Sequence, residues 1–193
     1  HIDFRDGDLL VARYHIGPEV AKPYFYPVSA PGGLKVTRGV PPPKGETSDH
    51  PHQKSAWFCH GDVIPEGIGL VRKVPNVKGV DFWSEAKGHG KIVVTKVEMP
   101  KTDKSTGRLA THNEWRTADG TKIMDEVRIY YFYDFGKARL IVFDITLQAT
   151  VCPITFADTK EGAMGVRVID DIVAGQTEQK TKGKGKKAEQ PAS

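Results

Sequence analysis

The sequence predicts an all-β protein, and an antiparallel β-sandwich is the natural architecture. The first observation is that apolar and polar residues alternate along several segments of the first 175 residues, with turn-forming residues between the segments. Alternation with a period of two is typical of strands that bury one face. The second observation is that no segment carries a long apolar stripe at the 3.6-residue period of an amphipathic helix. Two packed antiparallel sheets accommodate both observations.

Five segments show the clearest strand patterns. In chain order they are residues 9–14, 90–98, 109–117, 122–132 and 139–148. Ala118-Asp119-Gly120 predicts a hairpin turn between the third and the fourth segment. The fifth alternates most cleanly, with one side formed by Ile141, Phe143, Ile145 and Leu147. In the fourth, Asp125 shares a face with Val127 and Ile129, and a carboxylate buried on that face would need a polar partner.

Two segments lack a strand pattern. The prolines at positions 41–43 cannot donate to a β-ladder, so residues 41–48 are expected to form a loop. Residues 176–193 are mainly Lys, Gly, Gln and Thr, with almost nothing apolar. Such a segment buries too little apolar surface to offset the entropy of ordering it, so we expect a disordered tail or linker. The chain therefore divides into a β-sandwich domain, residues 1–175, and a Lys/Gly-rich tail, residues 176–193.

The charge distribution argues against a nucleic-acid partner. The 193 residues carry a net charge of +4. Five lysines and two glutamates give residues 176–193 a charge of +3, which leaves +1 for the other 175 residues. A nearly neutral domain exerts no strong attraction on a phosphate backbone. A solvated linker is the favoured interpretation of the basic tail.

Other features narrow the class of protein. No stretch approaches the roughly 18 apolar residues that span a bilayer, so we expect a soluble protein without a membrane partner. The chain begins at His1, so a leader could have been removed, and a periplasmic or secreted location stays open. Cys59 and Cys152 do not make a disulfide framework, and small buried side chains are the favoured interpretation. Motifs of nucleotide enzymes, serine hydrolases and zinc ribbons are missing.

The most informative window for function is Asp49 to His60, which holds three of the seven histidines of the chain. It directly follows the proline-rich loop, and functional sites often lie on loops. His50 and His52 are two residues apart, so in an extended chain both imidazoles point to the same side. Because imidazole titrates near neutral pH, we assign both as candidate catalytic residues for proton transfer. The alternative is that Pro51 bends the chain and each histidine fastens a loop carbonyl.

A metal site is the weaker interpretation of the same window. His60 would add a third ligand, and metal sites usually need three or four. A cupin-type site would also require a glutamate three or four residues after the His-x-His pair, where this chain has Ala56 and Trp57. We therefore assign no metal ligand, and the cofactor is left unknown.

Residues around the window supply candidate ligand contacts. Arg38 has a bidentate donor fork suited to a carboxylate or to two sugar hydroxyls, although a surface ion pair explains it equally well. Asp49 could orient an imidazole, accept a sugar hydroxyl or cap a loop. Aromatic rings can stack on a sugar or simply fill the core. The candidates for stacking are Tyr24, Tyr26, Trp57 and Trp83.

A series of short motifs runs in order along most of the chain. The motifs are Lys22-Pro-Tyr-Phe-Tyr-Pro27, Pro31-Gly-Gly33, Thr37-Arg38, Asp49-His-Pro-His52, Trp57-Phe58, Asp81-Phe-Trp83, and Phe156-Ala-Asp-Thr-Lys-Glu-Gly162 with Val166-Arg167. Together they resemble the PmoA-like family, uncharacterised bacterial proteins abundant in planctomycetes and labelled methane oxygenase PmoA. The resemblance covers residues 9–169. Where the family has His-His-Arg-Gly, this chain has His52-Gln53-Lys54-Ser55, and so lacks the second adjacent histidine.

The resemblance carries several expectations. The family is similar in layout to the galactose-mutarotase-like β-supersandwich, which commonly serves sugar epimerases, lyases and glycosidases. It therefore implies a carbohydrate ligand. It also implies that Lys160 and Arg167 line a pocket, where the pattern alone would indicate a charged turn. Family members continue beyond the point where this chain stops, so we expect the N-terminal portion of a longer protein and an incomplete supersandwich.

Three functions follow from these expectations. The first is a carbohydrate-active enzyme, such as a sugar epimerase, lyase or glycoside hydrolase, that uses His50 or His52 for proton transfer. The second is a non-catalytic glycan-binding module with the same pocket. The third is a structural domain of a larger protein, in which the histidines only fasten loops.

Overall fold

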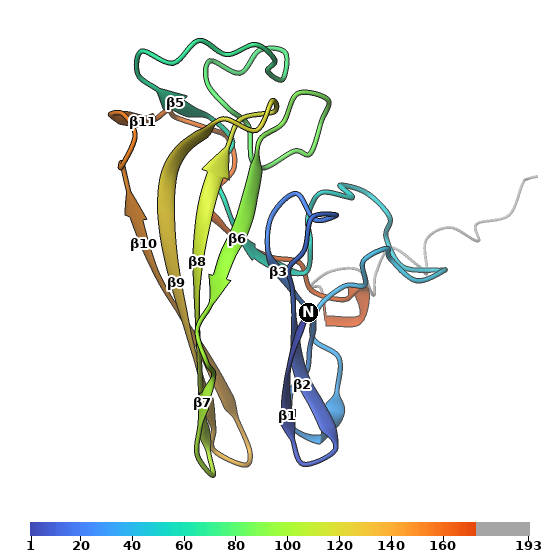
Figure 1. Cartoon of the computed structure of the whole chain (residues 1–193). Helices are drawn as coiled ribbons and strands as arrows, with labels where there is room; N and C mark the ends of the chain where they lie inside the picture. Colours follow the sequence, from blue (N-terminus) through green and yellow to red (C-terminus); the bar gives the residue numbers. More distant parts are fainter. Residues whose placement is uncertain (173–193) are drawn as a thin grey trace, which may run out of the picture.

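A computed structural model describes residues 1–172 of the chain (Figure 1). The described part consists of twelve β-strands and two single 3₁₀ turns, η1 (Pro31–Gly33) and η2 (Asp170–Ile172), and contains no α-helix. All pairings between the strands are antiparallel. The predicted all-β, antiparallel sandwich class is therefore confirmed. The predicted tail at residues 176–193 lies outside the described residues.

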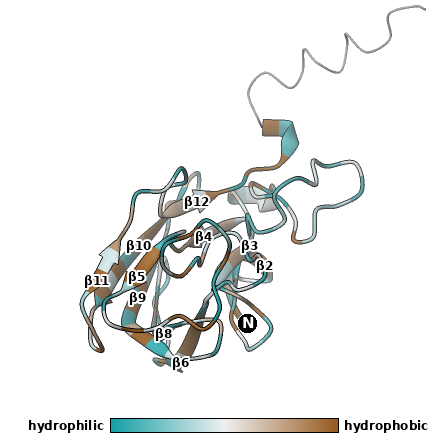
Figure 2. Ribbon diagram, turned by 90° about the horizontal axis from the view of Figure 1, so that it is seen from above, coloured by the Kyte–Doolittle hydropathy of each residue, from teal (hydrophilic) through white to brown (hydrophobic). Residues whose placement is uncertain are grey.

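Two five-stranded sheets form the two layers (Figures 1 and 2). The first sheet has the order β1 (Ile2–Asp6), β2 (Leu9–His15), β3 (Tyr24–Val28), β4 (Ala56–Phe58) and β12 (Met164–Val166). The second has the order β10 (Arg139–Gln148), β9 (Lys122–Asp134), β8 (Thr106–Arg116) and β6 (Lys91–Val97), and β7 (Lys101–Thr102) also pairs with β8. A small third sheet joins β5 (Val63–Pro65) to β11 (Ile154–Phe156).

The five strands expected from alternation are all present as β2, β6, β8, β9 and β10. The expected turn is also present, since Gly120 N–H donates to the carbonyl of Thr117 at 3.0 Å. The other seven strands are two to five residues long. A strand of that length repeats its pattern only once or twice, so alternation cannot reveal it.

Aromatic side chains fill the space between the two sheets. Phe25 of the first sheet packs edge-on against Tyr130 of the second, with ring centroids 4.8 Å apart. Phe4 stacks on Phe132 at 3.7 Å, and the hydroxyl of Tyr130 donates to that of Tyr14 at 3.1 Å. Large aromatic rings bury much apolar surface each, so a few of them suffice to join two short sheets.

The buried face of β9 is the opposite of the face that contains Asp125. Asp125 is half-buried on the outer face, where Lys122 Nζ lies 2.8 Å from its carboxylate. The inner face instead buries Glu126 and Arg128, which are 1% and 0% exposed. The face that Asp125 shares with Val127 and Ile129 is therefore the outer one, although its apolar residues allowed it to be the buried one. The reason is that the inner face of β9 contains a buried ion pair, which apolar patterning does not reveal.

Both cysteines are free thiols. Cys59 is fully buried in the core, as expected, and burial raises the pKa of its thiol to about 12. Cys152 is half-buried. Within residues 1–172, no helix has the length and apolar character needed to cross a membrane.

Candidate functional site

Arg38 anchors the loop that carries the histidines. Its side chain is 1% exposed. Nη1 donates to the carbonyl of Thr47 at 3.0 Å and to Asp49 Oδ1 at 2.9 Å, and Nη2 donates to the carbonyl of His50 at 3.2 Å. Because the guanidinium is buried and its Nη1 and Nη2 atoms already donate hydrogen bonds to the loop, it is not accessible to a ligand. Arg38 is therefore a positioning residue, and its predicted substrate contact is not what the structure shows.

The carboxylate of Asp49 contacts three other residues of the candidate site. Oδ1 accepts from Arg38 and, at 2.6 Å, from Nη2 of Arg167, while Oδ2 lies 2.8 Å from Nδ1 of His50. The hydrogen bonds from His50 and Arg38 lower the pKa of the Asp49 carboxyl, so it is ionised at neutral pH. The carboxylate fixes the orientation of the His50 ring, and this directs Nε2 away from Asp49. Of the interpretations given to Asp49 above, orienting an imidazole agrees with these contacts.

The two histidines lie together, but on a turn and not on an extended chain, since His50 has a φ of 47° and Gln53 N–H donates to the carbonyl of His50 at 2.9 Å. Their ring centroids are 5.7 Å apart in an edge-to-face arrangement. The side chain of His50 is 55% exposed, whereas His52 is half-buried. Burial lowers the pKa of His52, and the positive charges of Lys22 and His50 lower it further. His52 is therefore mainly neutral at pH 7, the form that can accept a proton.

Glu85 brings a second carboxylate to this region, and none of the sequence motifs named above includes it. Its Oε1 accepts a hydrogen bond at 2.8 Å from Nζ of Lys22, which also donates to the carbonyl of Trp83 at 2.8 Å. Its Oε2 lies 3.2 Å from Nζ of Lys54. The negative charge of Glu85 opposes the lowering of the His52 pKa. A usable signal was present, because Glu85 follows the Asp81-Phe-Trp83 motif by two residues.

Unusual backbone conformations concentrate in the same region. Four residues other than glycine have a positive φ among residues 1–172, and three of them belong to this region: His50 at 47°, Ser55 at 65° and Glu85 at 55°. The left-handed conformation is costly for residues with a Cβ, and persists only where the surroundings enforce it. Such outliers are enriched at binding and catalytic sites, so they mark this region as a candidate site.

The two tryptophans belong to the core instead of forming an open stacking surface. Trp57 and Trp83 are 3% and 7% exposed, and their ring centroids are 5.1 Å apart. The indole of Trp57 lies over Gly165, its partner across the β4–β12 pair, where a Cβ would come within 2.3 Å of the ring. Filling the core, the alternative given above, therefore describes both rings, and the glycine lets the indole of Trp57 pack down onto the sheet.

The other predicted residues have separate positions. Arg167 joins the cluster through Asp49 and through Gln53, whose Oε1 accepts from Nη1 at 3.0 Å. Tyr26 is half-buried on β3, and its carbonyl lies 2.8 Å from Nε2 of His15. Lys160 is exposed between β11 and β12, and no ion pair within the described residues links it to Asp49. The fold thus brings together Arg38, Asp49, His50, His52 and Arg167.

In the part of the chain that the structure covers, no three His, Cys, Asp or Glu side chains are grouped to hold a metal ion.

Residues 1–192 match the model of a family of unknown function, DUF6807. The chain belongs to this family. No curated protein and no solved structure matches the chain.

Proposed function

We propose that this DUF6807 member acts on or binds a sugar at the histidine cluster. The observation that carries the proposal is the pair formed by Asp49 and His50, with His52 beside it. An imidazole oriented by a carboxylate and a second, neutral imidazole make a pair able to give and to take a proton. The open-chain form of a sugar has a carbonyl group, and the carbon–hydrogen bond next to that carbonyl is acidic. Such a pair of imidazoles can exchange a proton with this carbon or with a sugar hydroxyl.

The proposed roles follow from the contacts. Neutral His52 takes the proton from a sugar carbon or hydroxyl, and His50, held by Asp49, gives one to the oxygen that becomes negative. Arg167 is partly exposed, with 28% of its side chain accessible, and it shares the Asp49 carboxylate with His50, so it would stabilise developing negative charge. Arg38 and Glu85 keep the loop and the nearby lysines in place. Sugar epimerisation fits these roles best among the candidate reactions.

The resemblance in sequence motifs supports the same proposal. It relates the chain to the PmoA-like proteins, whose layout is similar to the galactose-mutarotase-like supersandwich. Many sugar-processing enzymes share that layout, which raises the expectation of a carbohydrate ligand. Fold analogy does not itself assign chemistry, so the histidine pair remains the main support.

The proposal is tested with His52→Ala and a panel of reducing sugars. Proton exchange and epimerisation would be followed by NMR, and binding by calorimetry. We expect His52→Ala to lower turnover at least about tenfold while binding persists, because a positioned acid or base contributes about 10²- to 10⁴-fold in rate. Activity should also fall as the pH drops through the pKa of His52, which burial and nearby positive charges hold below the ordinary histidine value.

The matched control is His112→Ala, which removes a partly exposed histidine from β8 in the second sheet. It should leave both turnover and binding unchanged. Equal losses in the two variants, or turnover in His52→Ala as fast as in the unchanged protein, would contradict the catalytic role.

A non-catalytic glycan-binding module is the second candidate, and one observation favours it. More than half of the His50 side chain is open to solvent. Catalytic groups usually work in sites that exclude water, whereas a binding module needs only a shaped polar surface. Sugar binding that depends on His50 and His52, without turnover of any sugar in the panel, would support this candidate.

A further inference from the structure

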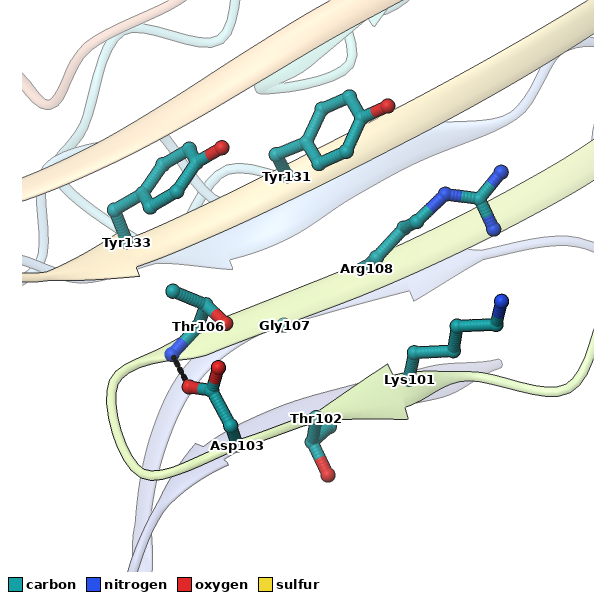
Figure 3. Close-up of a pocket in the computed structure, with 8 residues that line it drawn as sticks. All are labelled: Lys101, Thr102, Asp103, Thr106, Gly107, Arg108, Tyr131 and Tyr133. Atoms are coloured by element: carbon teal, nitrogen blue, oxygen red, sulfur yellow. Dashed lines mark hydrogen bonds between the residues drawn. The ribbon is translucent and has the colours of Figure 1, made fainter.

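A hollow of about 280 Å³ opens on the outer face of the second sheet, on the side away from the core (Figure 3). The strand register places its residues in rows. Lys101 of β7 is opposite Arg108 of β8, and Arg108 is opposite Tyr131 of β9. The next row pairs Thr106 with Tyr133. These side chains therefore share one face of three adjacent strands, and in Figure 3 the ends of Lys101 and Arg108 point the same way.

Aromatic rings continue along the same face. Tyr131 and Tyr133 have nearly parallel rings, 18° apart in orientation, with centroids at 6.5 Å. Phe135 extends the row, with its ring centroid 6.3 Å from that of Tyr133, and the residue is 66% exposed. On the neighbouring strand, Leu140 and Val142 lie opposite the two tyrosines and are 48% and 36% exposed. This is an apolar platform of ring faces and methyl groups that borders the hollow.

Two cations line one side of the hollow. Lys101 has no ion-pair partner within residues 1–172, whereas one nitrogen of Arg108 lies 3.3 Å from Glu98. The only carboxylate in the lining, Asp103, accepts hydrogen bonds from the backbone N–H groups of Ser105 and Thr106 at 3.1 and 2.9 Å. Asp103 is therefore held by its own turn. The hollow offers one free ammonium and part of a guanidinium to a ligand.

We propose that this hollow binds an acidic oligosaccharide, one that carries a carboxylate on its sugar rings. The carbon–hydrogen face of a sugar ring is weakly positive and packs on the negative face of Tyr131 or Tyr133. The carboxylate is met by Lys101 and by the planar donors of Arg108. The hollow and its platform are separate from the histidine cluster. Binding of an acidic oligosaccharide here does not depend on the function proposed for that cluster.

The charge pattern favours an acidic glycan over single-stranded nucleic acid. Nucleic-acid grooves combine stacking rings with a continuous positive track along the backbone. Here Glu98 already neutralises part of Arg108, and Asp103 lies in the lining. Two cations on one side of the hollow can meet a carboxylate beside the stacking rings, but they form no continuous positive track for a phosphate chain.

The test measures binding of a galacturonic acid tetramer by calorimetry at low ionic strength. The tetramer esterified with methanol has the same rings without the charge and serves as the matched ligand. We expect the ester to bind at least about tenfold more weakly, because it loses the charge-assisted contacts. Lys101→Gln and Arg108→Gln should each weaken binding of the acid about tenfold, and Tyr133→Ala should weaken both ligands about threefold to tenfold.

Two control variants complete the experiment. Lys96→Gln removes an exposed lysine from the same sheet, opposite His112 and outside the hollow, and should leave binding unchanged. His52→Ala should also bind the acid normally. Equal binding of acid and ester, absence of binding, tighter binding of an eight-residue oligothymidylate, or loss of binding in His52→Ala would each overturn the proposal. The last result would instead assign the glycan to the histidine cluster.

Discussion

At the scale of single residues, the contacts of Asp49 show which parts of the candidate site could be predicted from the sequence and which could not. Its contact with His50 is local, and orienting an imidazole was one of the three roles that the sequence left open for Asp49. Its contact with Arg167 spans 118 residues, and only the family resemblance, not spacing, pointed to Arg167. Arg38 was recognised as important, but its burial was not, because a buried and an exposed arginine look alike in a sequence. Burial depends on the loop that folds over it.

The first prediction at this scale concerns Asp49→Asn. The contacts of Asp49 lower its pKa in the folded protein, so the unfolded chain takes up the proton more readily as the pH falls. The carboxylate therefore stabilises the fold above its unfolded pKa of about 3.9, and this contribution is lost as the pH falls through the lower, folded value. Because Asp49 is 43% exposed, we expect Asp49→Asn to reduce the free energy of unfolding by only about 1 kcal/mol at pH 7.

Urea unfolding at pH 7 and at pH 3 measures this effect. The gap in free energy of unfolding between Asp49→Asn and the unchanged protein should narrow at pH 3, because this pH lies below the unfolded pKa of about 3.9 and the unfolded chain then takes up a proton. A gap that stays the same in acid would show that the ionised carboxylate is not the stabilising form.

At the scale of elements, the residue pattern and the length of each strand decided which strands, and which of their faces, could be predicted from the sequence. In β10, residues alternate between half-buried and exposed along the whole strand, as the sequence indicated. In β9 the alternation was visible, but the inner face was not identified, because it carries Glu126 and Arg128 while the outer face carries Val127 and Ile129. β4 and β12 have three residues each and no periodic signal. Their pairing depends on a close approach between Trp57 and Gly165.

The prediction at this scale is that Gly165→Ala destabilises the β4–β12 pair. The new Cβ would meet the indole of Trp57 at 2.3 Å, and this ring is wedged against Trp83. Overpacking of this kind typically costs about 1–3 kcal/mol. Gly162→Ala is the matched control, because no atom lies within 4 Å of its Cβ position, and it should change stability by less than about 0.5 kcal/mol. Thermal unfolding of the two variants would show equal stability if the indole could move aside freely.

At the scale of the whole molecule, a buried polar network joins the two sheets. The Glu126 carboxylate accepts from Arg128, from Nε1 of Trp115 at 2.9 Å and from the amide of Asn113 at 2.5 Å. Nη2 of Arg128 then crosses to the first sheet, where it donates to the carbonyl of Phe58 at 3.0 Å. The sequence could predict two packed sheets but not this bridge, because residues 58 and 128 are brought together only by the completed sandwich.

The last prediction is that Arg128→Met destabilises the sandwich far more than the loss of a surface ion pair. It leaves the buried Glu126 carboxylate without its cation, which typically costs about 3–5 kcal/mol. Lys122→Met, on the same strand, breaks the partly exposed pairs with Asp125 and Glu114 and should change the stability only slightly. Adding Glu126→Gln to Arg128→Met should recover part of the stability, because a neutral amide can still accept from Trp115 without a buried charge. Chemical unfolding of the three variants tests the order. If the double variant were less stable than Arg128→Met alone, the cost would come from lost packing and not from an unpaired charge between the sheets.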